Sequence, residues 1–499
     1  MPGKIVIAGG GLGGLSAGAY LCQHGIPITL VEEQPHVGGY AIAFNRDEFV
    51  FDVALHAVPA GDTGQPFHNL VSQLGLEKDI QFLRLKEAFL IRLGKYQFQI
   101  PNNYKDFFNK LIREFPDESD GLKRLDLYLS QNAPIFFKVV NGDAGLLEIS
   151  GKFAPKIPRF LKLSNMTTNA FLEQFTKNQK VKALLYQAAV FFGQPMNEFP
   201  AINFIIMFYL LFTTGMFTIH GGGQALTDAL ERKILENGGE IISGKQVVNI
   251  WVENNYAKSV ELNDGSILSA DAVISNINTT ILIRKHIGEK YFKSDYLESL
   301  NALTPSISII QLHLGLDCPV TELGIDQHIQ VYFPDENVDH SINRQNDSLD
   351  IEGFSILAPG ITDPNTDTNN ERILSIVGGV SANNWLELNP EDYIKMKEKT
   401  TASIIEKLDI LFTGIKKHIK TVDLATPRTF NRYTQNINGA ILGYKILPSM
   451  HRTLFKISRF PIKNIFLASA WTSNLGGFMQ SVKSGIDAGK KVKTYLNRQ

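Results

Sequence analysis

The hydrophobic pattern changes its period within the first thirty residues of the chain. Residues 4–9 are a short run of apolar and β-branched side chains, and 12–25 continue at helical spacing up to a glycine. A second β-branched run follows at 28–33. A strand, a helix and a second strand in this order predict a parallel sheet with helices on its faces. The five glycines in 9–14 would weaken the apolar helix of an export signal, so we expect no such signal.

Later segments repeat both periods. Helical spacing is found in four further stretches, at 104–132, 165–192, 392–412 and 481–496. Runs typical of strands lie at 240–244, 247–253, 257–262 and 465–470. Two polar segments, 336–350 and 362–372, are predicted to be surface loops. The alternation of helices and strands favours an α/β fold.

The most apolar stretch runs from Phe199 to Ile219 and contains no Asp, Glu, Lys, Arg or His. Pro200 and Gly215 limit its uninterrupted helical part to about 14 residues, or about 21 Å. A bilayer core is about 30 Å thick, which argues against a membrane span. A buried core helix and the wall of an apolar binding site both stay open. For the second interpretation we expect a substrate tunnel lined by Phe204, Met207, Phe208, Leu211 and Phe212.

Composition and charge narrow the class of protein. The chain has 499 residues and a formal net charge of -1, without the basic excess that nucleic-acid-binding proteins usually show. The two cysteines, Cys22 and Cys318, form no CxxC pattern, which excludes a disulfide framework and a zinc finger. Their scarcity fits a reducing compartment, so we expect a cytoplasmic protein without a metal site. The number of subunits stays open.

The first helix opens with a glycine pattern typical of dinucleotide binding. Gly9, Gly11 and Gly14 satisfy GxGxxG between a predicted strand and a predicted helix. The first glycine allows a tight turn, the second lets a pyrophosphate approach the backbone, and the third lets the helix pack closely against the strand. Glu32 ends the next strand, where its carboxylate can accept hydrogen bonds from an adenosine ribose.

The residues after Glu32 indicate which dinucleotide is bound. An acid, four residues, an apolar residue and Gly38-Gly39 resemble the extended FAD-binding fingerprint of the amine-oxidase-like flavoproteins. Near the other end, the strand at 465–470 and the glycines Gly476-Gly477 fit a helix N-terminus directed at a flavin. We therefore predict that FAD is bound by Gly9, Gly11, Leu12, Gly13, Gly14, Glu32, Glu33, Gly38, Gly39, Tyr40, Val247, Ser469, Gly477, Phe478 and Met479.

Further motifs resemble those of one group of FAD enzymes, the phytoene desaturases, carotenoid isomerases and retinol saturases. The segments FDVALH at 51–56, HGGGQALTDAL at 220–230 and TPRT at 426–429 are similar to motifs of this group. Tyr40 stands where the desaturases usually carry an arginine that the isomerases and saturases lack. Ser469-Ala470 replaces a usual Gly-Asp or Gly-Gln pair. The first departure favours the isomerases and saturases.

This resemblance implies an α/β fold with two parts. One is a Rossmann-like FAD-binding domain of the glutathione-reductase or amine-oxidase type, and the other is a discontinuous mixed α+β substrate domain. We expect the FAD-binding domain in residues 1–88, 216–300 and 420–499. The substrate domain would comprise 89–215 and 301–419, with the active site where the two domains meet.

The resemblance also implies hydride transfer between flavin N5 and a carbon–carbon bond of a hydrophobic polyene or isoprenoid substrate. Desaturation, saturation and isomerisation all stay open. Such chemistry needs chiefly the placement of the substrate in a dry site. The candidate catalytic residues are His56, His220, Tyr433 and Trp471, each with a structural role as the alternative.

Other functions on the same fold also stay open. One is an amine or amino-acid oxidase, and another is a non-catalytic FAD-binding interaction protein. A third is the reduction of a prenylated quinone or a lipid in place of a carotenoid. The first requires a site that recognises a cationic or carboxylate group, whereas the apolar stretch before His220 favours a hydrophobic substrate.

A segment at 147–164 combines basic and apolar side chains. Four of each alternate, namely Lys152, Lys156, Arg159 and Lys162 with Phe153, Ile157, Phe160 and Leu161. Basic residues around an apolar face suit peripheral contact with an anionic membrane, from which a lipid-soluble substrate would be drawn. A solvated basic loop is the alternative. Pro155 and Pro158 argue against a long regular helix here.

Overall fold

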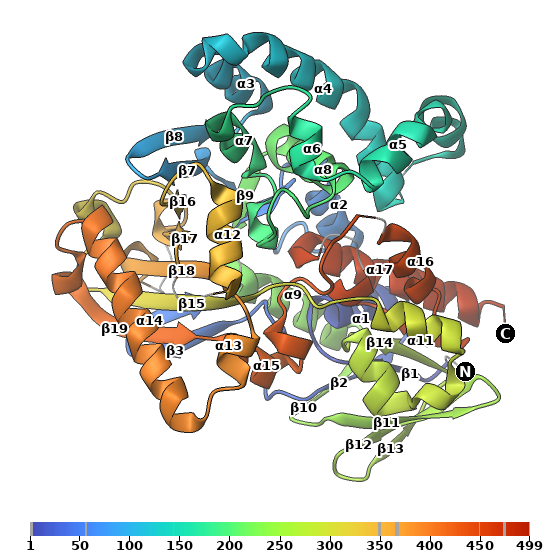
Figure 1. The fold of residues 1–499 in the computed structure, drawn as a ribbon. Coiled ribbons are helices and arrows are strands. Elements are labelled where there is room, and N and C mark those ends of the chain that lie inside the picture. Colours follow the sequence, from blue (N-terminus) through green and yellow to red (C-terminus); the bar gives the residue numbers. More distant parts are fainter. Residues whose placement is uncertain are drawn as a thin grey trace.

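The computed structural model describes residues 3–54, 57–142, 144–347, 351–364, 369–448, 450–472 and 476–498. In Figure 1 a parallel sheet lies at the lower right and a larger mixed sheet at the left, with a helical region above both. We call the first part the parallel-sheet lobe and the second the mixed-sheet lobe. Both chain ends lie beside the parallel-sheet lobe (Figure 1).

Five parallel strands form the first sheet, in the order β10, β2, β1, β14 and β20. Their bounds are Glu240–Ser243, Ile28–Glu32, Ile5–Ala8, Ala272–Ser275 and Ile465–Leu467. β1 is buried on both sides. Ile5 and Ile7 belong to one hydrophobic cluster, and Val6 and Ala8 belong to another on the opposite face. Burial on both faces explains why the strand reads as a continuous apolar run.

Three helices pack together on one face of this sheet, namely α1 (Leu12–Gln23), α9 (Gly222–Glu236) and α17 (Gly477–Leu496). Glycines allow their close approach, because a Cβ on Gly485 would lie 2.2 Å from the carbonyl oxygen of Gly13. The other face is covered by a small antiparallel sheet. Its strands β11, β12 and β13 span Val247–Glu253, Tyr256–Leu262 and Ile267–Ser269.

The mixed sheet has the strand order β19, β15, β18, β17, β16, β7 and β8. Strands β7 and β8 span Glu87–Leu93 and Tyr96–Pro101. Strands β15 to β19 span, in order, Ser308–Leu316, Ile329–Phe333, Phe354–Leu357, Ile373–Val380 and Ile419–Ala425. Helix α14 (Pro390–Leu411) covers one face, where Leu312 of β15 meets Ile404 and Leu408. Ile309 points to the opposite face, toward the parallel-sheet lobe.

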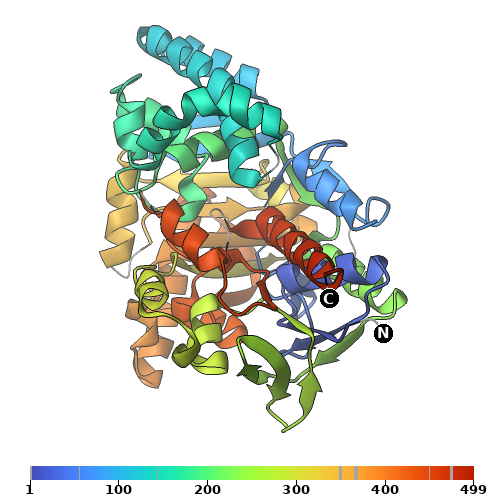
Figure 2. The same ribbon diagram turned by 90° about the vertical axis from the view of Figure 1, so that its right-hand side faces the viewer.

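The helical region lies at the top of Figures 1 and 2. Its helices α3 to α8 span Tyr104–Glu114, Ser119–Asn141, Ile157–Ser164, Thr168–Leu172, Gln179–Tyr186 and Ala201–Thr214. α8 is the apolar stretch, and it packs against α4, α5 and α6 with most of its side chains buried. Within the described ranges, no helix combines the length and the apolar character that crossing a bilayer demands.

Two predictions of local structure are wrong in part. The segment 336–350, expected as a loop, contains helix α12 (Val338–Asp347). Val338 and Ile342 bury a narrow apolar stripe at i, i+4 spacing, which the polar composition of the segment concealed. The stretch 165–192 is divided between α6 and α7, because Asn178 caps a new helix by accepting from two backbone N–H groups.

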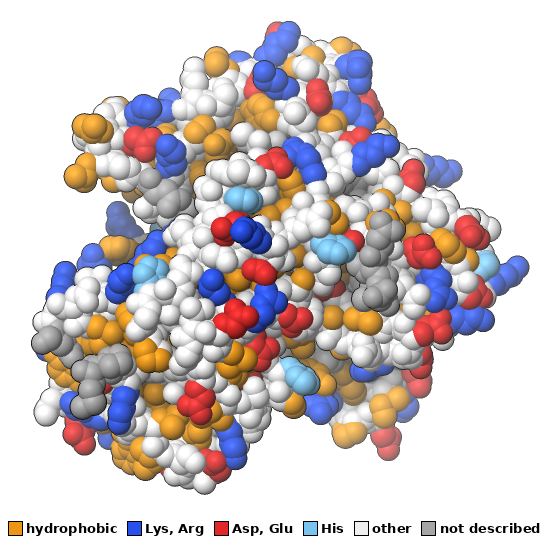
Figure 3. Space-filling model, turned by 180° about the vertical axis from the view of Figure 1, so that it is seen from behind, with side chains coloured by type: hydrophobic (Ala, Val, Ile, Leu, Met, Phe, Trp, Pro, Cys, Tyr) orange, Lys and Arg blue, Asp and Glu red, His pale blue; other side chains and the backbone are white. Residues whose placement is uncertain are grey.

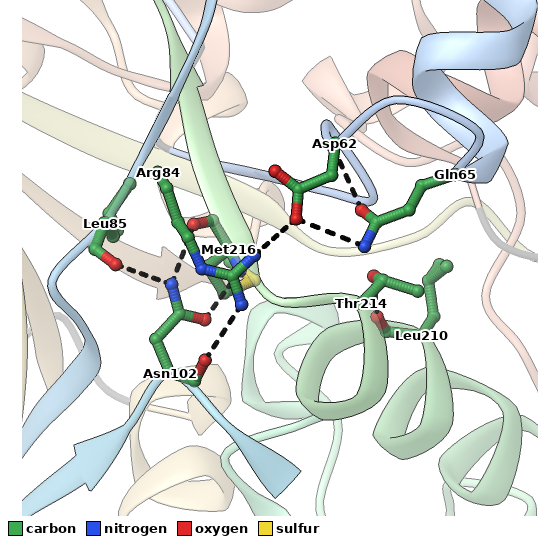
Figure 4. Close-up of polar contacts among 8 residues, drawn as sticks. All are labelled: Asp62, Gln65, Arg84, Leu85, Asn102, Leu210, Thr214 and Met216. Carbon is green, nitrogen blue, oxygen red and sulfur yellow. Dashed lines mark hydrogen bonds and ion pairs between the residues drawn. The ribbon is translucent and has the colours of Figure 1, made fainter.

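The chain leaves α8 through a turn that polar side chains hold in place (Figure 4). Asn102 donates from Nδ2 to the carbonyls of Leu85 and Met216 at 2.7 and 2.9 Å, and its Oδ1 accepts from the Met216 N–H at 2.7 Å. The guanidinium of Arg84 lies only 2.5 Å from where a Cβ on Gly215 would be. The end of the apolar helix is therefore fixed by its neighbours as well as by its own sequence.

The remaining elements connect these parts. The strands β3 to β6 and β9 span Ala43–Arg46, Phe49–Asp52, Val58–Pro59, Phe82–Arg84 and Met216–Ile219. The helices α2, α10, α11, α13, α15 and α16 span Pro66–Gln73, Thr279–Ile281, Ser294–Asn301, Asn383–Leu386, Pro427–Thr434 and His451–Ser458. The domain division at 88, 216, 300 and 420 stays a prediction. β19 pairs with β15 although it lies almost wholly beyond position 420.

Candidate active site

A cavity of about 510 Å³ lies between the parallel-sheet and mixed-sheet lobes. One end begins at the carboxyl ends of β1, β2 and β14, where Gly9, Glu32 and Asn276 line it. The other end reaches the mixed sheet, where Ile309 and Val377 form the wall. In open parallel sheets, ligands bind beyond the carboxyl ends of the strands. We call these two parts the nucleotide end and the apolar end.

The glycine turn at the nucleotide end has the geometry that its sequence predicts. Gly9 adopts a φ of +99°, which favours glycine. A Cβ on Gly13 would lie 2.0 Å from the carbonyl oxygen of Ala468, so a larger residue does not fit. A Cβ on Gly14 would lie 2.1 Å from the carbonyl oxygen of Gly9, so this position serves helix packing and does not itself line the cavity. Gly11 and Leu12 line the cavity at the start of α1.

Glu32 faces the cavity from the end of β2, with Glu33 beside it. Its Oε2 accepts from the Gly10 N–H at 2.6 Å, and its Oε1 accepts from the Gln34 N–H at 2.9 Å. Burial raises the pKa of the Glu32 carboxyl above its usual range, and these two hydrogen bonds oppose that shift. The carboxylate is thus held in a fixed orientation and remains an acceptor for a ligand's hydroxyl groups.

The next turn brings Gly38, Gly39 and Tyr40 to the cavity. Gly38 and Gly39 have φ angles of +124° and +61°, and a Cβ on Gly39 would lie 3.3 Å from the Cα of Gly11. The Tyr40 hydroxyl donates to the carbonyl of Ala440 at 3.2 Å. Burial raises the pKa of Tyr40, so its side chain is neutral at physiological pH.

The C-terminal helix contributes its first turn to the same cavity. Gly477, Phe478 and Met479 line it at the N-terminus of α17. The N–H groups and the dipole of a helix N-terminus favour negative charge on a ligand. Ser469 also lines the cavity, and its Oγ accepts from the Trp471 N–H at 3.3 Å.

Sequence reasoning missed several residues at the nucleotide end. Val247, which was predicted, lines the cavity together with Gln246 and His286. The His286 Nδ1 lies 3.2 Å from the Val248 carbonyl, and burial lowers the pKa of its imidazole. Asn276 directly follows β14, and this position at the carboxyl end of a central strand is a signal that could have identified it.

The apolar end is built from residues that the sequence did not single out. Five residues from the mixed sheet, or from the segment just before β15, line this end. They are Ile307, Ile309, Leu357, Val377 and Gly379. These residues alternate along the strands as they do on any buried sheet face. The sequence pattern therefore could not distinguish a binding site from ordinary core. Met207 and Leu211 of α8, two members of the expected tunnel, meet them from the helical region.

The aromatic members of the expected tunnel lie elsewhere. Phe204, Phe208 and Phe212 are buried in an aromatic cluster and are not among the residues that line the cavity. The ring centroid of Phe212 lies 4.7 Å from that of Phe107 and 4.7 Å from that of Phe208. Helical spacing placed all five residues on adjacent faces of α8, but only the face with Met207 and Leu211 borders the cavity.

The candidate catalytic residues separate in the structure. Trp471 and Tyr433 line the cavity, and Trp471 donates from Nε1 to Asn436 Oδ1 at 2.9 Å. His220 does not line it; its Nδ1 lies 2.8 Å from Asp363 Oδ1, which ties the start of α9 to a loop of the mixed-sheet lobe. His56 lies outside the described residues.

One group of potential metal ligands occurs among the described residues, away from this cavity. Asp317, Cys318 and His418 each place one ligand atom within 4.8 Å of the others. The ammonium of Lys420 already lies 3.3 Å from Asp317 Oδ2, and His418 Nδ1 lies 2.8 Å from Asp317 Oδ1. Both oxygens of the Asp317 carboxylate therefore have partners.

The nucleotide end fits an FAD molecule. Gly9, Gly11 and Gly39 line it with backbone alone, and Glu32 offers a carboxylate for ribose hydroxyls. Atoms of Asn276 lie 3.1 to 3.4 Å from where a Cβ on Gly9, Gly11 or Gly13 would stand. The buried Oδ1 of Asn276 has no hydrogen-bond partner. A buried polar atom of this kind is normally satisfied by a ligand or a water molecule.

Comparison with known proteins agrees with this geometry. The model of the family described as flavin containing amine oxidoreductase matches residues 12–492. Prolycopene isomerase of Daucus carota is 25% identical over 454 residues, covering 87% of this chain and 71% of that protein. The 4,4'-diaponeurosporene oxygenase of Staphylococcus haemolyticus is 23% identical over 505 residues, covering 98% and 97%. These relatives confirm the resemblance that the motifs indicated.

The fold is also similar to that of a solved putrescine oxidase. The TM-score is 0.65 at 14% identity, with all of both chains covered. At this identity the similarity speaks for the fold alone, and it confirms the predicted FAD-binding α/β architecture. The chain belongs to the flavin-containing amine oxidoreductase family, and it is an FAD-dependent oxidoreductase.

Proposed function

We propose that the protein oxidises, reduces or isomerises a carbon–carbon bond system in a hydrophobic polyene or isoprenoid. The observation that carries this proposal is the chemistry of the apolar end. Ile307, Ile309, Leu357, Val377 and Met207 form its walls. Among the described residues, every charged side chain that lines the cavity comes from segments 32–33, 245 or 285–286, at the nucleotide end.

The relatives support the same substrate class. Their names include a prolycopene isomerase and a 4,4'-diaponeurosporene oxygenase, which act on long conjugated hydrocarbons or their derivatives. An amine substrate would bring a cation that needs a carboxylate or similar partner when buried. The described lining of the apolar end offers no such group, so an amine or amino-acid oxidase is the weaker alternative.

The residues of the chain would act chiefly by binding and by excluding water. FAD supplies two-electron redox chemistry when bound. The apolar walls hold a polyene beside it through the hydrophobic effect, and Trp471 and Tyr433 would complete the walls near the flavin. Tyr40 would contribute a neutral hydroxyl held by Ala440.

The nucleotide end would hold FAD through the predicted residues. We infer that Glu32 accepts from the ribose and that the first turns of α1 and α17 face the diphosphate and the flavin. The parallel-sheet lobe would then be the FAD-binding domain, and the mixed-sheet lobe with the helical region would be the substrate domain. Asn276 and His286 join the predicted set.

Anaerobic titration of the FAD-loaded protein tests the substrate class. We expect reduced or oxidised flavin to change its absorbance with prolycopene or 4,4'-diaponeurosporene, or the polyene to change its isomer composition by chromatography. Putrescine serves as the amine control. If putrescine alone bleaches the flavin, the polyene proposal is wrong. If neither compound class reacts and the flavin stays unchanged, the alternative of an FAD-binding interaction protein gains support.

Peripheral membrane contact is part of the proposal. In the segment 147–164, Phe153 and Phe160 pack inward on Phe136 in place of forming a free apolar face. The exposed apolar side chains are instead Leu146, Leu147, Ile149, Ile157 and Leu161. Together with Lys152 and Lys162 they form what we call the membrane patch. Figure 3 shows apolar and basic side chains gathered at the upper left of the molecule, where this segment appears from behind.

Co-sedimentation with vesicles tests the membrane patch. Leu146 and Leu147 are 86% and 87% exposed, so Leu146→Ser with Leu147→Ser should leave the fold intact. We expect this variant to lose most of its binding to vesicles that contain anionic lipid. The matched control is Ile410→Ser, an 81% exposed apolar side chain on α14. Equal binding by both variants would remove the patch from the proposal.

A further inference from the structure

A second cavity, of about 680 Å³, lies between the helical region and the parallel-sheet lobe. The end of α4, with Phe137 and Val140, forms one wall together with Ile206 of α8. The opposite wall is α17 and the segment 458–467. α4 runs down toward α17 in Figures 1 and 2. We call this cavity the lysine cleft.

The wall formed by the parallel-sheet lobe is strongly basic. Four lysines line the cleft with one carboxylate, an excess of three positive charges, whereas the whole chain has a net charge of -1. Lys483 is neutralised by Asp487, whose carboxylate lies 2.6 Å away on the next turn of α17. The other three lysines, Lys463, Lys490 and Lys491, carry the excess.

These three ammonium groups meet only neutral partners. Lys490 donates to the amide oxygen of Gln73 at 2.9 Å, and Lys463 lies 4.9 Å from the ring centroid of Tyr256. Lys491 is exposed. Within the described part of the chain no ion pair involves any of the three. Positive charges concentrated in a concave site attract an anion.

The facing wall is apolar and leads to the membrane patch. Val140 is partly exposed opposite the lysines, whereas Phe137 and Ile206, which are 6% and 1% exposed, contribute only their edges. Gly142 lies at the edge of the cleft, at the end of α4, and the exposed Leu146 and Leu147 follow a few residues later. The cleft therefore has a basic wall opposite an apolar one, and the chain leads from its edge to side chains suited to a bilayer.

We propose that the lysine cleft binds one phospholipid with an anionic, phosphate-bearing headgroup. The phosphate lies against Lys463, Lys490 and Lys491, and the acyl chains run past Val140 at the end of α4 toward the membrane patch. This lipid site is separate from the flavin cavity, although Gln480 in the first turn of α17 lines both. It requires neither the polyene reaction nor its substrate.

Calorimetric titration of the FAD-loaded protein tests the site, with dihexanoyl phosphatidylglycerol kept below its micelle concentration. We expect it to bind at least about tenfold more tightly than dihexanoyl phosphatidylcholine or glycerophosphoglycerol. The comparison with phosphatidylcholine measures how much the anionic headgroup contributes to affinity. The comparison with glycerophosphoglycerol measures how much the acyl chains contribute. Equal affinity for glycerophosphoglycerol would mean a phosphate site without lipid recognition and would overturn the proposal.

A charge-matched pair of variants locates the binding. Lys463→Gln with Lys490→Gln and Lys491→Gln should weaken phosphatidylglycerol binding by at least about tenfold. The control, Lys397→Gln with Lys399→Gln and Lys417→Gln, removes the same charge elsewhere and should change it less than about twofold. Equal loss in both variants, or none in the first, would contradict the proposal. Flavin absorbance and polyene turnover in detergent should be unchanged in both variants, which separates this test from that of the proposed function.

Discussion

The two ends of the flavin cavity differ in how their sequences relate to their function. At the nucleotide end the backbone itself surrounds the ligand site, so the positions need glycine: Gly13 has the Ala468 carbonyl 2.0 Å from where a Cβ would stand. At the apolar end, side chains such as Ile309 and Val377 form the walls. The nucleotide end is therefore defined by glycines that only a close backbone approach requires. The apolar end is defined by residues typical of any hydrophobic core.

The two ends should therefore respond differently to amino-acid substitutions. A substitution that enlarges a glycine at the nucleotide end meets backbone atoms, which cannot move without shifting a strand or a helix. A substitution at the apolar end meets the flexible ends of side chains, as with Gly379 beside Ile307 Cδ1. We expect the first kind to remove FAD and the second kind to change substrate selection.

The largest expected effect is that of Gly13→Ala. Its Cβ would overlap the Ala468 carbonyl at the start of α1, so we expect loss of FAD retention and destabilisation of about 3 kcal/mol or more. Flavin absorbance of the purified protein and thermal unfolding measure both. Gly145→Ala is the control, because no atom lies within 4 Å of its Cβ position. A yellow, stable Gly13→Ala protein would contradict the close contact between α1 and Ala468 as a requirement of the FAD site.

The two faces of α8 provide a second contrast. Phe208 is fully buried in the aromatic cluster, so Phe208→Ala should cost about 3–5 kcal/mol of unfolding free energy. Met207 borders the cavity and is only partly buried, so Met207→Ala should cost about 1 kcal/mol and chiefly alter the KM for a polyene. Denaturant unfolding and kinetics separate the two effects. If Phe208→Ala changed KM and left stability intact, the tunnel would lie on the other face.

The sequence singled out most of the glycines and the acid that line the nucleotide end, because the chemistry there constrains residue type. Glycines at Gly9 and Gly11 and the acid Glu32 were found by pattern, and only residues with ordinary neighbours, such as Asn276 and His286, were missed. The apolar end could not be predicted, since Ile307 or Leu357 looks like core until the other lobe is in place. For the same reason, helical spacing alone could not decide which face of α8 borders the cavity.

Gly379→Ala should change substrate binding without loss of FAD. The new Cβ would lie 2.5 Å from Ile307 Cδ1, which forces this side chain toward the cavity. We expect the KM for a polyene to rise about tenfold, with kcat less affected. Gly378→Ala is the control on the opposite face of β18, where the Cβ meets Ile351 Cγ2 at 2.7 Å. A similar KM change in both variants would mean that the effect arises from strain in the strand.

The smallest expected effect is a pH dependence of FAD binding at Glu32. Burial raises the pKa of this carboxyl, so it takes up a proton at a higher pH than an ordinary glutamate does. The ribose hydroxyls need the carboxylate as acceptor, so proton uptake by Glu32 in the FAD-free protein opposes FAD binding. The increase in Tm caused by saturating FAD should therefore shrink as the pH falls from about 8 to about 5.

The variant Glu32→Gln isolates this contribution because its amide does not titrate. Its FAD-induced increase in Tm should be smaller at pH about 8 and nearly independent of pH over the same range. The neighbouring Glu33 has the same direction of shift, since burial also raises its pKa, so Glu33→Gln is the matched control and should keep the dependence. If the dependence disappeared in Glu33→Gln and persisted in Glu32→Gln, the ribose acceptor would be Glu33. The fixed orientation of Glu32 by Gly10 and Gln34 argues for the opposite result.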